Sequence, residues 1–253
     1  MNVRFGRALR YVAGNYLRSV GVLCLVMALI PPVMLAIAYF LGGRTASTTS
    51  FNGYSLAVGV FGLVLGIVGL RENQRVLNQN GVSRRSAFLA DMAALAAASA
   101  LVAAGSTVIM GAYQAVLDGE GRVLITDIYQ LLYEPAGRSP GNLVRGAVLS
   151  TAMGWMLAAL GQLCSALYWR LNRFWTVVLS AAMPLALIFG SVPLINWMGS
   201  TSAGQAAARA LAACGRFLMT SPWNLAAVLL VLGAAGFGLS WLLLRRANIR
   251  AAK

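Results

Sequence analysis

Residues 87–113 read AFLADMAALAAASALVAAGSTVIMGAY, a run in which Asp91 is the only charged side chain. An α-helix rises about 1.5 Å per residue, so roughly 20 apolar residues cross a hydrocarbon core about 30 Å thick. The run is long enough for one membrane span. It also has no continuous polar face of the kind that a helix on a soluble protein presents to water. The sequence therefore predicts a transmembrane helix here.

Five further runs have the same character, and Arg145 is the only charged side chain in them. They are Val20–Leu41, Tyr54–Leu70, Val144–Tyr168, Phe174–Trp197 and Trp223–Leu244. Across 253 residues the chain is 59% hydrophobic and 10% charged, whereas a soluble domain has about 25% charged residues. We therefore expect an all-α polytopic membrane protein, with six transmembrane helices in one membrane domain over residues 1–253. The first run is too long for the apolar part of a cleaved signal peptide.

The basic residues predict the orientation of these spans. The net charge is +14, and 14 of the 20 basic residues lie before the first run, after the second, after the fourth and after the sixth. The positive-inside rule then places both termini in the cytoplasm. Four of the 6 acidic residues lie in the expected extracellular loop 114–143, which also contains a short helical pattern at Asp127–Tyr133. The basic surplus indicates orientation and contact with lipid phosphates, and no separate basic domain is present to bind nucleic acid.

The missing residue types exclude several chemistries. The chain has no His, which excludes Ser-His-Asp catalysis and His-ligated zinc. Its three cysteines, Cys24, Cys164 and Cys214, have no metal-site or disulfide spacing. The sequence also lacks the GxxxxGK[ST] motif that binds ATP. We therefore expect no enzyme activity, no metal site and no cofactor in this chain.

The N-terminal residues 1–18 combine arginines with apolar residues at helical spacing, including Phe5, Leu9, Val12 and Tyr16. This pattern predicts an amphipathic helix lying in the cytoplasmic membrane interface. A charged flank of the first span is the alternative.

Small residues mark a packing face on the second run. They are Gly59, Gly62, Gly66 and Gly69. Such residues allow helix backbones to approach closely, either within the chain or at a subunit interface.

Asp91 is a candidate pathway carboxylate because acids inside a span are costly and frequently functional. The alternative, which we favour from sequence, is an Asp facing the cytoplasmic interface near Arg84, seven residues away.

The segment Arg71–Ser86, RENQRVLNQNGVSRRS, is the most informative loop. Arg71–Gln79 is expected to form a short helix, Asn80–Gly81 to stop it, and Ser83 to cap the next span. An ordinary basic loop is the alternative.

Arg71–Phe88 resembles the loop between spans 2 and 3 of small bacterial ATP-binding-cassette (ABC) exporter permeases of the type-2 class. The resemblance implies an N-terminal interfacial helix, a coupling helix at Arg71–Gln79, and a helix near Gln205–Phe217 between the last two spans. It also implies a separate ATPase subunit that holds ATP and Mg, a second permease as homo- or heterodimer partner, and a place in the bacterial cell membrane. The implied ATPase contacts are Arg71, Glu72, Asn73, Arg75, Asn80, Gly81, Ser83 and Arg84.

The function expected from this resemblance is ATP-driven export of a hydrophobic or amphipathic substrate, such as a peptide, lipid or drug. Two other functions stay open: a secondary carrier, for which Pro31–Pro32 and Pro184 loosely fit broken spans, and a non-transporting immunity or assembly factor. A membrane enzyme is disfavoured because paired acids or metal ligands are missing from the spans.

Overall fold

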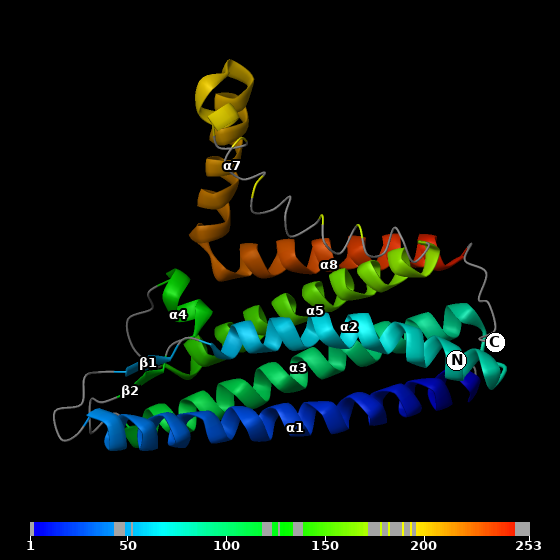
Figure 1. Ribbon diagram of the computed structural model, residues 1–253, viewed down its shortest axis with the longest axis horizontal. Helices are drawn as coiled ribbons and strands as arrows, with labels where there is room; N and C mark the ends of the chain where they lie inside the picture. The colour runs from blue at the N-terminus through cyan, green and yellow to red at the C-terminus, as the bar shows by residue number, and fades with distance from the viewer. Residues whose placement is uncertain are drawn as a thin grey trace.

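The computed structural model describes residues 3–42, 49–51, 53–117, 123–125, 127–133, 139–171 and 196–245, and the single positions 178, 182, 189 and 193. Within them, five helices are long and apolar enough to cross a membrane. These are α1 (Val3–Gly42), α2 (Tyr54–Gln79), α3 (Arg84–Leu117), α5 (Pro140–Arg170) and α8 (Pro222–Arg245). They lie side by side along the long axis of the molecule (Figure 1). The chain is thus a helical protein with the character of a membrane protein.

Five of the six predicted spans fall within these five helices. The remaining prediction, Phe174–Trp197, lies almost entirely outside the described residues. Helices α1 and α3 run in one direction and α2, α5 and α8 in the other, so α1 begins, α2 turns into α3, and α5 and α8 end at one end of the bundle, on the right in Figure 1. We call this the turn end, and the opposite one the loop end.

The predicted N-terminal interfacial helix at residues 1–18 is not confirmed, because α1 is one helix from Val3 to Gly42 in the described residues. Its buried side chains continue at helical spacing through the expected boundary, from Ala8 and Val12 to Tyr16 and Val20. This stripe packs against α3. Burial of a continuous stripe favours one straight helix over a break.

The predicted helix at Arg71–Gln79 is helical but is not confirmed as a separate element, since these residues are the last turns of α2. Leu70, Asn73, Gln74 and Leu77 are all buried and fall on one face. That buried face continues across the expected boundary between span and loop. A helix that ended at this boundary would lose the packing of its last buried residues, so α2 continues to Gln79.

Aromatic side chains hold α3, α5 and α8 together. Phe88 packs edge-on against Phe237, with ring centroids 6.5 Å apart. The ring centroids of Phe88 and Trp241 are 5.3 Å apart. Trp155, which the sequence places inside a span rather than at its end, lies 5.1 Å from Phe237. Trp155 is therefore a packing residue of the contact between α5 and α8.

Short elements gather at the loop end. Strand β1 (Thr49–Phe51) pairs in parallel with β2 (Val123–Ile125), and α4 (Ile128–Tyr133) confirms the predicted small helix. The expected loop 114–143 is shorter than predicted, because α3 reaches Leu117 and α5 begins at Pro140 after the cap Ser139.

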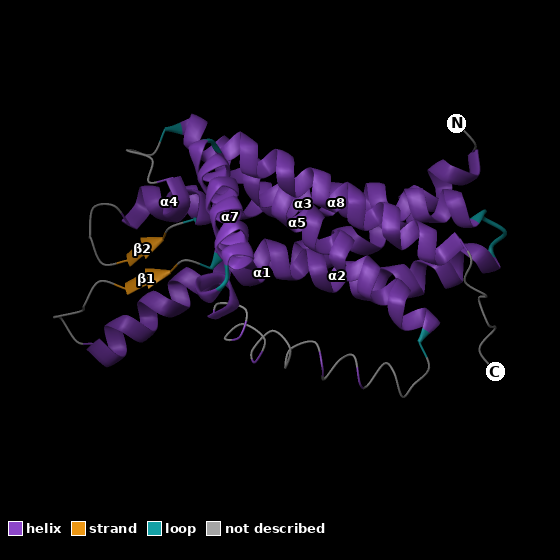
Figure 2. Ribbon diagram, turned by 90° about the horizontal axis from the view of Figure 1, so that it is seen from above, coloured by secondary structure: helices purple, strands orange, loops and turns teal. Residues whose placement is uncertain are grey.

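Helix α7 (Ser202–Thr220) precedes α8 and projects away from the bundle (Figures 1 and 2). It covers the predicted helix at Gln205–Phe217. The Tyr133 hydroxyl of α4 donates to the Leu218 carbonyl at 2.8 Å and lies 3.3 Å from the Ser221 carbonyl. This contact ties α4 to the turn between α7 and α8.

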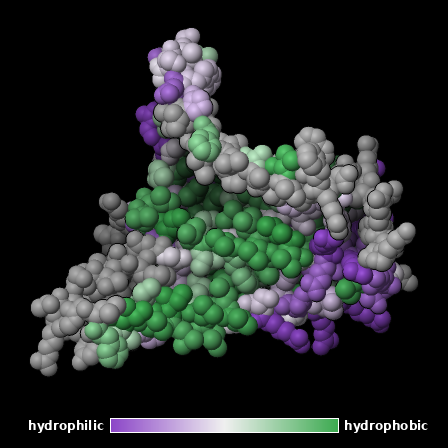
Figure 3. All heavy atoms as spheres, viewed as in Figure 1, coloured by the Kyte–Doolittle hydropathy of each residue, from purple (hydrophilic) through white to green (hydrophobic). Residues whose placement is uncertain are grey.

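The molecular surface matches a membrane-spanning bundle. Figure 3 shows hydrophobic side chains over the middle of the bundle and hydrophilic ones at the turn end. Large apolar side chains are exposed along the spans, for example Val22 (65% exposed) on α1, Leu56 (60%) on α2 and Val231 (68%) on α8. Apolar exposure on this scale is costly in water and favourable in lipid.

Candidate functional site: a buried polar cluster behind an exposed turn

Four polar side chains from four helices meet inside the bundle. The Asp91 carboxylate of α3 accepts hydrogen bonds from the Tyr16 hydroxyl of α1 and from the Asn73 side-chain amide of α2, each at 2.7 Å. The Gln162 side-chain amide of α5 donates to the other Asp91 oxygen. Asn73 also donates to the Tyr16 hydroxyl at 2.9 Å. We call these four residues the Asp91 cluster.

The Asp91 cluster is almost completely enclosed. Asp91 and Gln162 are 0% exposed, Asn73 is 1% and Tyr16 is 3% exposed. Burying a carboxylate is costly unless it receives hydrogen bonds, and three neutral donors supply them here. The side-chain oxygens of Asn73 and Gln162 have no hydrogen-bond partner among the described residues.

Gly69 makes the room that this cluster needs. A Cβ atom at Gly69 would overlap the hydroxyl of Tyr16. The fourth glycine of the predicted packing face therefore lets Tyr16 reach Asp91 and Asn73.

The structure corrects the sequence interpretation of Asp91. The favoured prediction was an Asp facing the membrane interface near Arg84, but Asp91 points into the bundle centre. The reason is the stripe of small buried residues on α3, such as Ala87, Ala90, Ala94 and Ala98, which puts Asp91 on the packed face. Tyr16, Asn73 and Gln162 were not predicted as its partners. The one sequence feature that could have indicated a partner is Gln162, a side-chain amide inside an apolar run.

The α2–α3 turn is built as the sequence predicts. Gly81 has φ +70°, which glycine adopts without strain. The Gly81 amide donates to the Asn78 carbonyl at 3.1 Å and the Val82 amide to the Leu77 carbonyl at 3.0 Å, the pattern of a Schellman helix end. Ser83 then caps α3 by accepting from the Ser86 amide at 3.2 Å.

Seven of the eight predicted ATPase contacts are exposed at this turn end. They are Arg71, Glu72, Arg75, Asn80, Gly81, Ser83 and Arg84. The eighth, Asn73, is buried in the Asp91 cluster and is therefore no surface contact. Arg71, Glu72 and Arg75 lie on the outer side of the same helical turns whose inner side carries Asn73.

The small-residue face of α2 packs within the chain. A Cβ at Gly62 would overlap the Gly154 carbonyl of α5, and one at Gly66 the Ala158 carbonyl. Gly59 faces the Leu157 and Met153 side chains, also on α5. In the described structure these glycines serve the α2–α5 contact.

Comparisons of the chain with protein-family models, curated proteins and solved structures return no match. The class that the described residues define is a helical protein with five candidate membrane-spanning helices.

Proposed function

We propose that the chain is the membrane subunit of an ATP-driven exporter of the ABC class, with ATP hydrolysis in a separate subunit. In this proposal the chain has six spans, with Phe174–Trp197 as the fifth, and both termini are in the cytoplasm of a bacterial cell. It pairs with a second permease. Its substrate is hydrophobic or amphipathic, such as a peptide, lipid or drug.

The observation that carries the proposal is the continuity of α2 from the bundle into the exposed turn end. Arg71, Glu72 and Arg75 are open to a cytoplasmic partner, while Asn73 between them bonds to Asp91 and Tyr16. A displacement of the outer side of these turns therefore acts directly on the Asp91 cluster. That cluster joins α1, α2, α3 and α5, so a movement of the end of α2 is transmitted to the other three helices.

Hydrogen bonds are suited to linking helices that move, because they exchange partners at a modest cost in free energy. Interhelical hydrogen bonds in membranes contribute about 0.6 kcal/mol on average. The Asp91 cluster can thus hold one arrangement of the four helices and release it when α2 moves. The Gly62 and Gly66 contacts keep α2 and α5 together during such a movement.

A proton- or cation-coupled carrier is the second candidate. It is favoured by the same cluster, since a buried carboxylate with two amides and a phenol on four helices offers oxygen ligands inside the bundle. In such a carrier, the driving gradient acts at Asp91 rather than at the α2–α3 turn.

Charge reversal at the turn tests the first proposal. Glu72→Arg with Arg75→Glu keeps the net charge and leaves the buried face of α2 untouched. We expect loss of ATPase co-purification and of ATPase stimulation, whereas Arg209→Glu on α7 serves as an exposed control. Unchanged assembly and stimulation in the double variant contradict the assignment.

Asp91→Asn separates the two candidates. A carrier loses its dependence on the proton or cation gradient in this variant. For an ATP-driven exporter reconstituted with its ATPase, transport by the variant still depends on ATP. Transport by both the original protein and the variant is then unaffected by the proton or cation gradient.

A further inference from the structure

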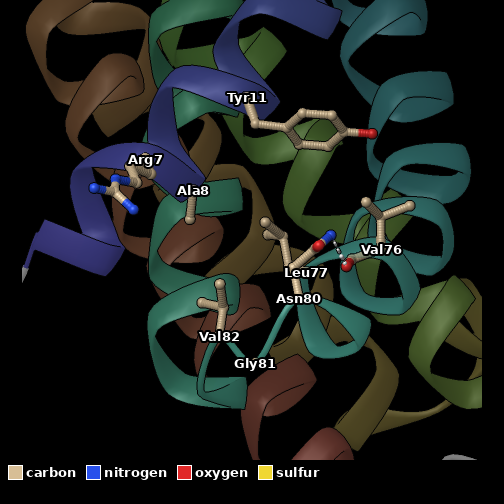
Figure 4. Close-up of a pocket in the computed structure, with 8 residues that line it drawn as sticks. All are labelled: Arg7, Ala8, Tyr11, Val76, Leu77, Asn80, Gly81 and Val82. Carbon is tan, nitrogen blue, oxygen red and sulfur yellow. Dashed lines mark hydrogen bonds between the residues drawn. The ribbon is translucent and has the colours of Figure 1, made fainter.

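A pocket lies at the turn end between the beginning of α1 and the α2–α3 turn (Figure 4), with a volume of about 470 Å³. Helix α1 contributes Arg7, Ala8 and Tyr11. The other side is formed by the end of α2 and the turn, with Val76, Leu77, Asn80, Gly81 and Val82. The pocket is separate from the Asp91 cluster, whose residues do not line it.

The lining is apolar at its base and polar at its rim. Ala8 is 1% exposed and Leu77 is 4% exposed, while Arg7 and Asn80 are exposed. The Asn80 amide donates one N–H to the Val76 carbonyl at 2.8 Å, and a side-chain amide has a second N–H to offer. A ligand here meets the Arg7 guanidinium on the α1 side, the Asn80 amide on the turn side and hydrocarbon at the base.

The charge around the pocket favours an anion. The exposed charged residues on α1 and on the turn that surrounds the pocket are arginines, with Glu72 as the one acid among the described residues there. The arginines are Arg7, Arg10, Arg18, Arg71, Arg75, Arg84 and Arg85. Basic pockets between membrane helices on the positively charged side of a protein are typical sites for anionic lipid headgroups.

Exposed apolar side chains also lie on the helix that forms one side of the pocket. Tyr11 lines it and is 46% exposed, and along the same helix Leu17 (50%) and Val22 (65%) are exposed apolar side chains. A tyrosine ring between a polar rim and an apolar surface is typical of the membrane interface. An occupant with a charged head and hydrocarbon tails fits both parts, whereas a small free anion uses only the rim.

We propose that this pocket binds the headgroup of an anionic phospholipid, with the phosphate at Arg7 and Asn80 and the acyl chains along α1. The site is a lipid site next to the exposed turn, and it does not depend on transport. Because Asn80 and Gly81 line the pocket and belong to the proposed ATPase contact, a bound lipid would sit directly beside that contact.

Native mass spectrometry of the full chain in detergent tests this, with phosphatidylglycerol as the anionic probe and phosphatidylcholine as the zwitterionic one. Arg7→Gln removes the pocket cation. Arg10→Gln is the matched control, because Arg10 is exposed on the same helix but does not line the pocket. Val76→Trp fills the pocket without changing charge.

We expect Arg7→Gln to weaken phosphatidylglycerol binding about fivefold, the factor for one basic residue at an anionic lipid, and Val76→Trp to weaken it as well. Arg10→Gln should bind as the original chain does, and soluble glycerol phosphate should not compete. Equal weakening by Arg7→Gln and Arg10→Gln overturns the pocket in favour of diffuse attraction. Competition by glycerol phosphate overturns the lipid in favour of a free phosphate.

A photoreactive residue at Val82 in native membranes gives a second readout. A lipid adduct on the chain is expected. Absence of any lipid adduct contradicts the proposal, with or without a cross-link to the ATPase that is proposed to contact the neighbouring Asn80 and Gly81.

Discussion

At the scale of single residues, Asp91 shows how one side chain organises several helices. Its carboxylate accepts hydrogen bonds from α1, α2 and α5, so it links each of these helices to α3. A buried donor that loses its acceptor costs about 1–3 kcal/mol. The cluster is therefore sensitive to loss of the acceptor and tolerant of changes that keep one.

Asp91→Ala is predicted to destabilise the protein by several kcal/mol, because it orphans donors on Tyr16, Asn73 and Gln162 at about 1–3 kcal/mol each. Asp91→Asn keeps the size and one acceptor, and it should cost less. Thermal unfolding in detergent measures both, with Val64→Ala on the exposed side of α2 as the control. An unfolding temperature for Asp91→Ala equal to that of Val64→Ala would sink this account of the cluster.

Asp127 is the second residue with a predicted effect, and it lies outside the spans at the start of α4. It is 6% exposed, and burial raises the pKa of its carboxyl from 3.8 to about 6, although the Ile128 amide at 2.8 Å favours the charged form. Its other oxygen faces Gly146 of α5. The folded state thus holds the Asp127 proton more tightly than the unfolded state.

Stability from this group is therefore full below about pH 4 and is lost as pH rises through about 6. Two units of pKa correspond to at most about 3 kcal/mol. Asp127→Asn, which keeps a capping side chain, should remove this part of the dependence when unfolding temperatures are compared between pH 4 and 7. The same pH profile in both proteins would show that Asp127 is not its source.

At the scale of elements, the α2–α5 contact rests on glycine. Backbone carbonyls of α5 occupy the space that a side chain at Gly62 or Gly66 needs. Overpacking a tight contact costs about 1–3 kcal/mol, while Ala in an open helical position is favourable relative to Gly.

Gly66→Ala is predicted to destabilise by about 1–3 kcal/mol. Gly238→Ala on α8 makes the same chemical change where nothing lies within 4 Å, and it should be neutral or stabilising. The difference in unfolding temperature between the two variants is the measurement. Equal effects would mean that α2 and α5 are not in backbone contact.

The elements also show what sequence patterns can predict and what they cannot. The turn was predictable because Asn80, Gly81 and Ser83 act through local backbone geometry. The first residue of α1 and the last residue of α2 were not predictable. Buried stripes that include Tyr16 and Asn73 continue past the apolar runs and pack on helices far away in sequence. Hydropathy marks where a helix is in lipid, and tertiary burial decides how far it extends.

At the scale of the whole molecule, the same limit applies to the candidate site. The membrane character followed from apolar runs, since five of the predicted spans are helices of suitable length. The meeting of Asp91, Asn73 and Gln162 depends on the rotation of three helices about their axes, which the small-residue stripes suggest only in outline. The parallel β1–β2 pair joins two loops that no local pattern links.

On the described residues, hydrophilic side chains lie at the turn end and apolar side chains along the bundle (Figure 3). The proposed exporter uses this polarity: the turn end receives a partner and the Asp91 cluster receives its movement. The central claim is therefore that a separate P-loop ATPase contacts the exposed last turns of α2.

Photo-cross-linking in native cells tests this claim most directly, with a photoreactive residue at Arg75 on α2 and, as control, at Arg209 on α7, both exposed. The account predicts that mass spectrometry identifies a P-loop ATPase cross-linked from position 75 and not from position 209. Absence of any P-loop ATPase from the position 75 products, with the protein intact in the membrane, would contradict it.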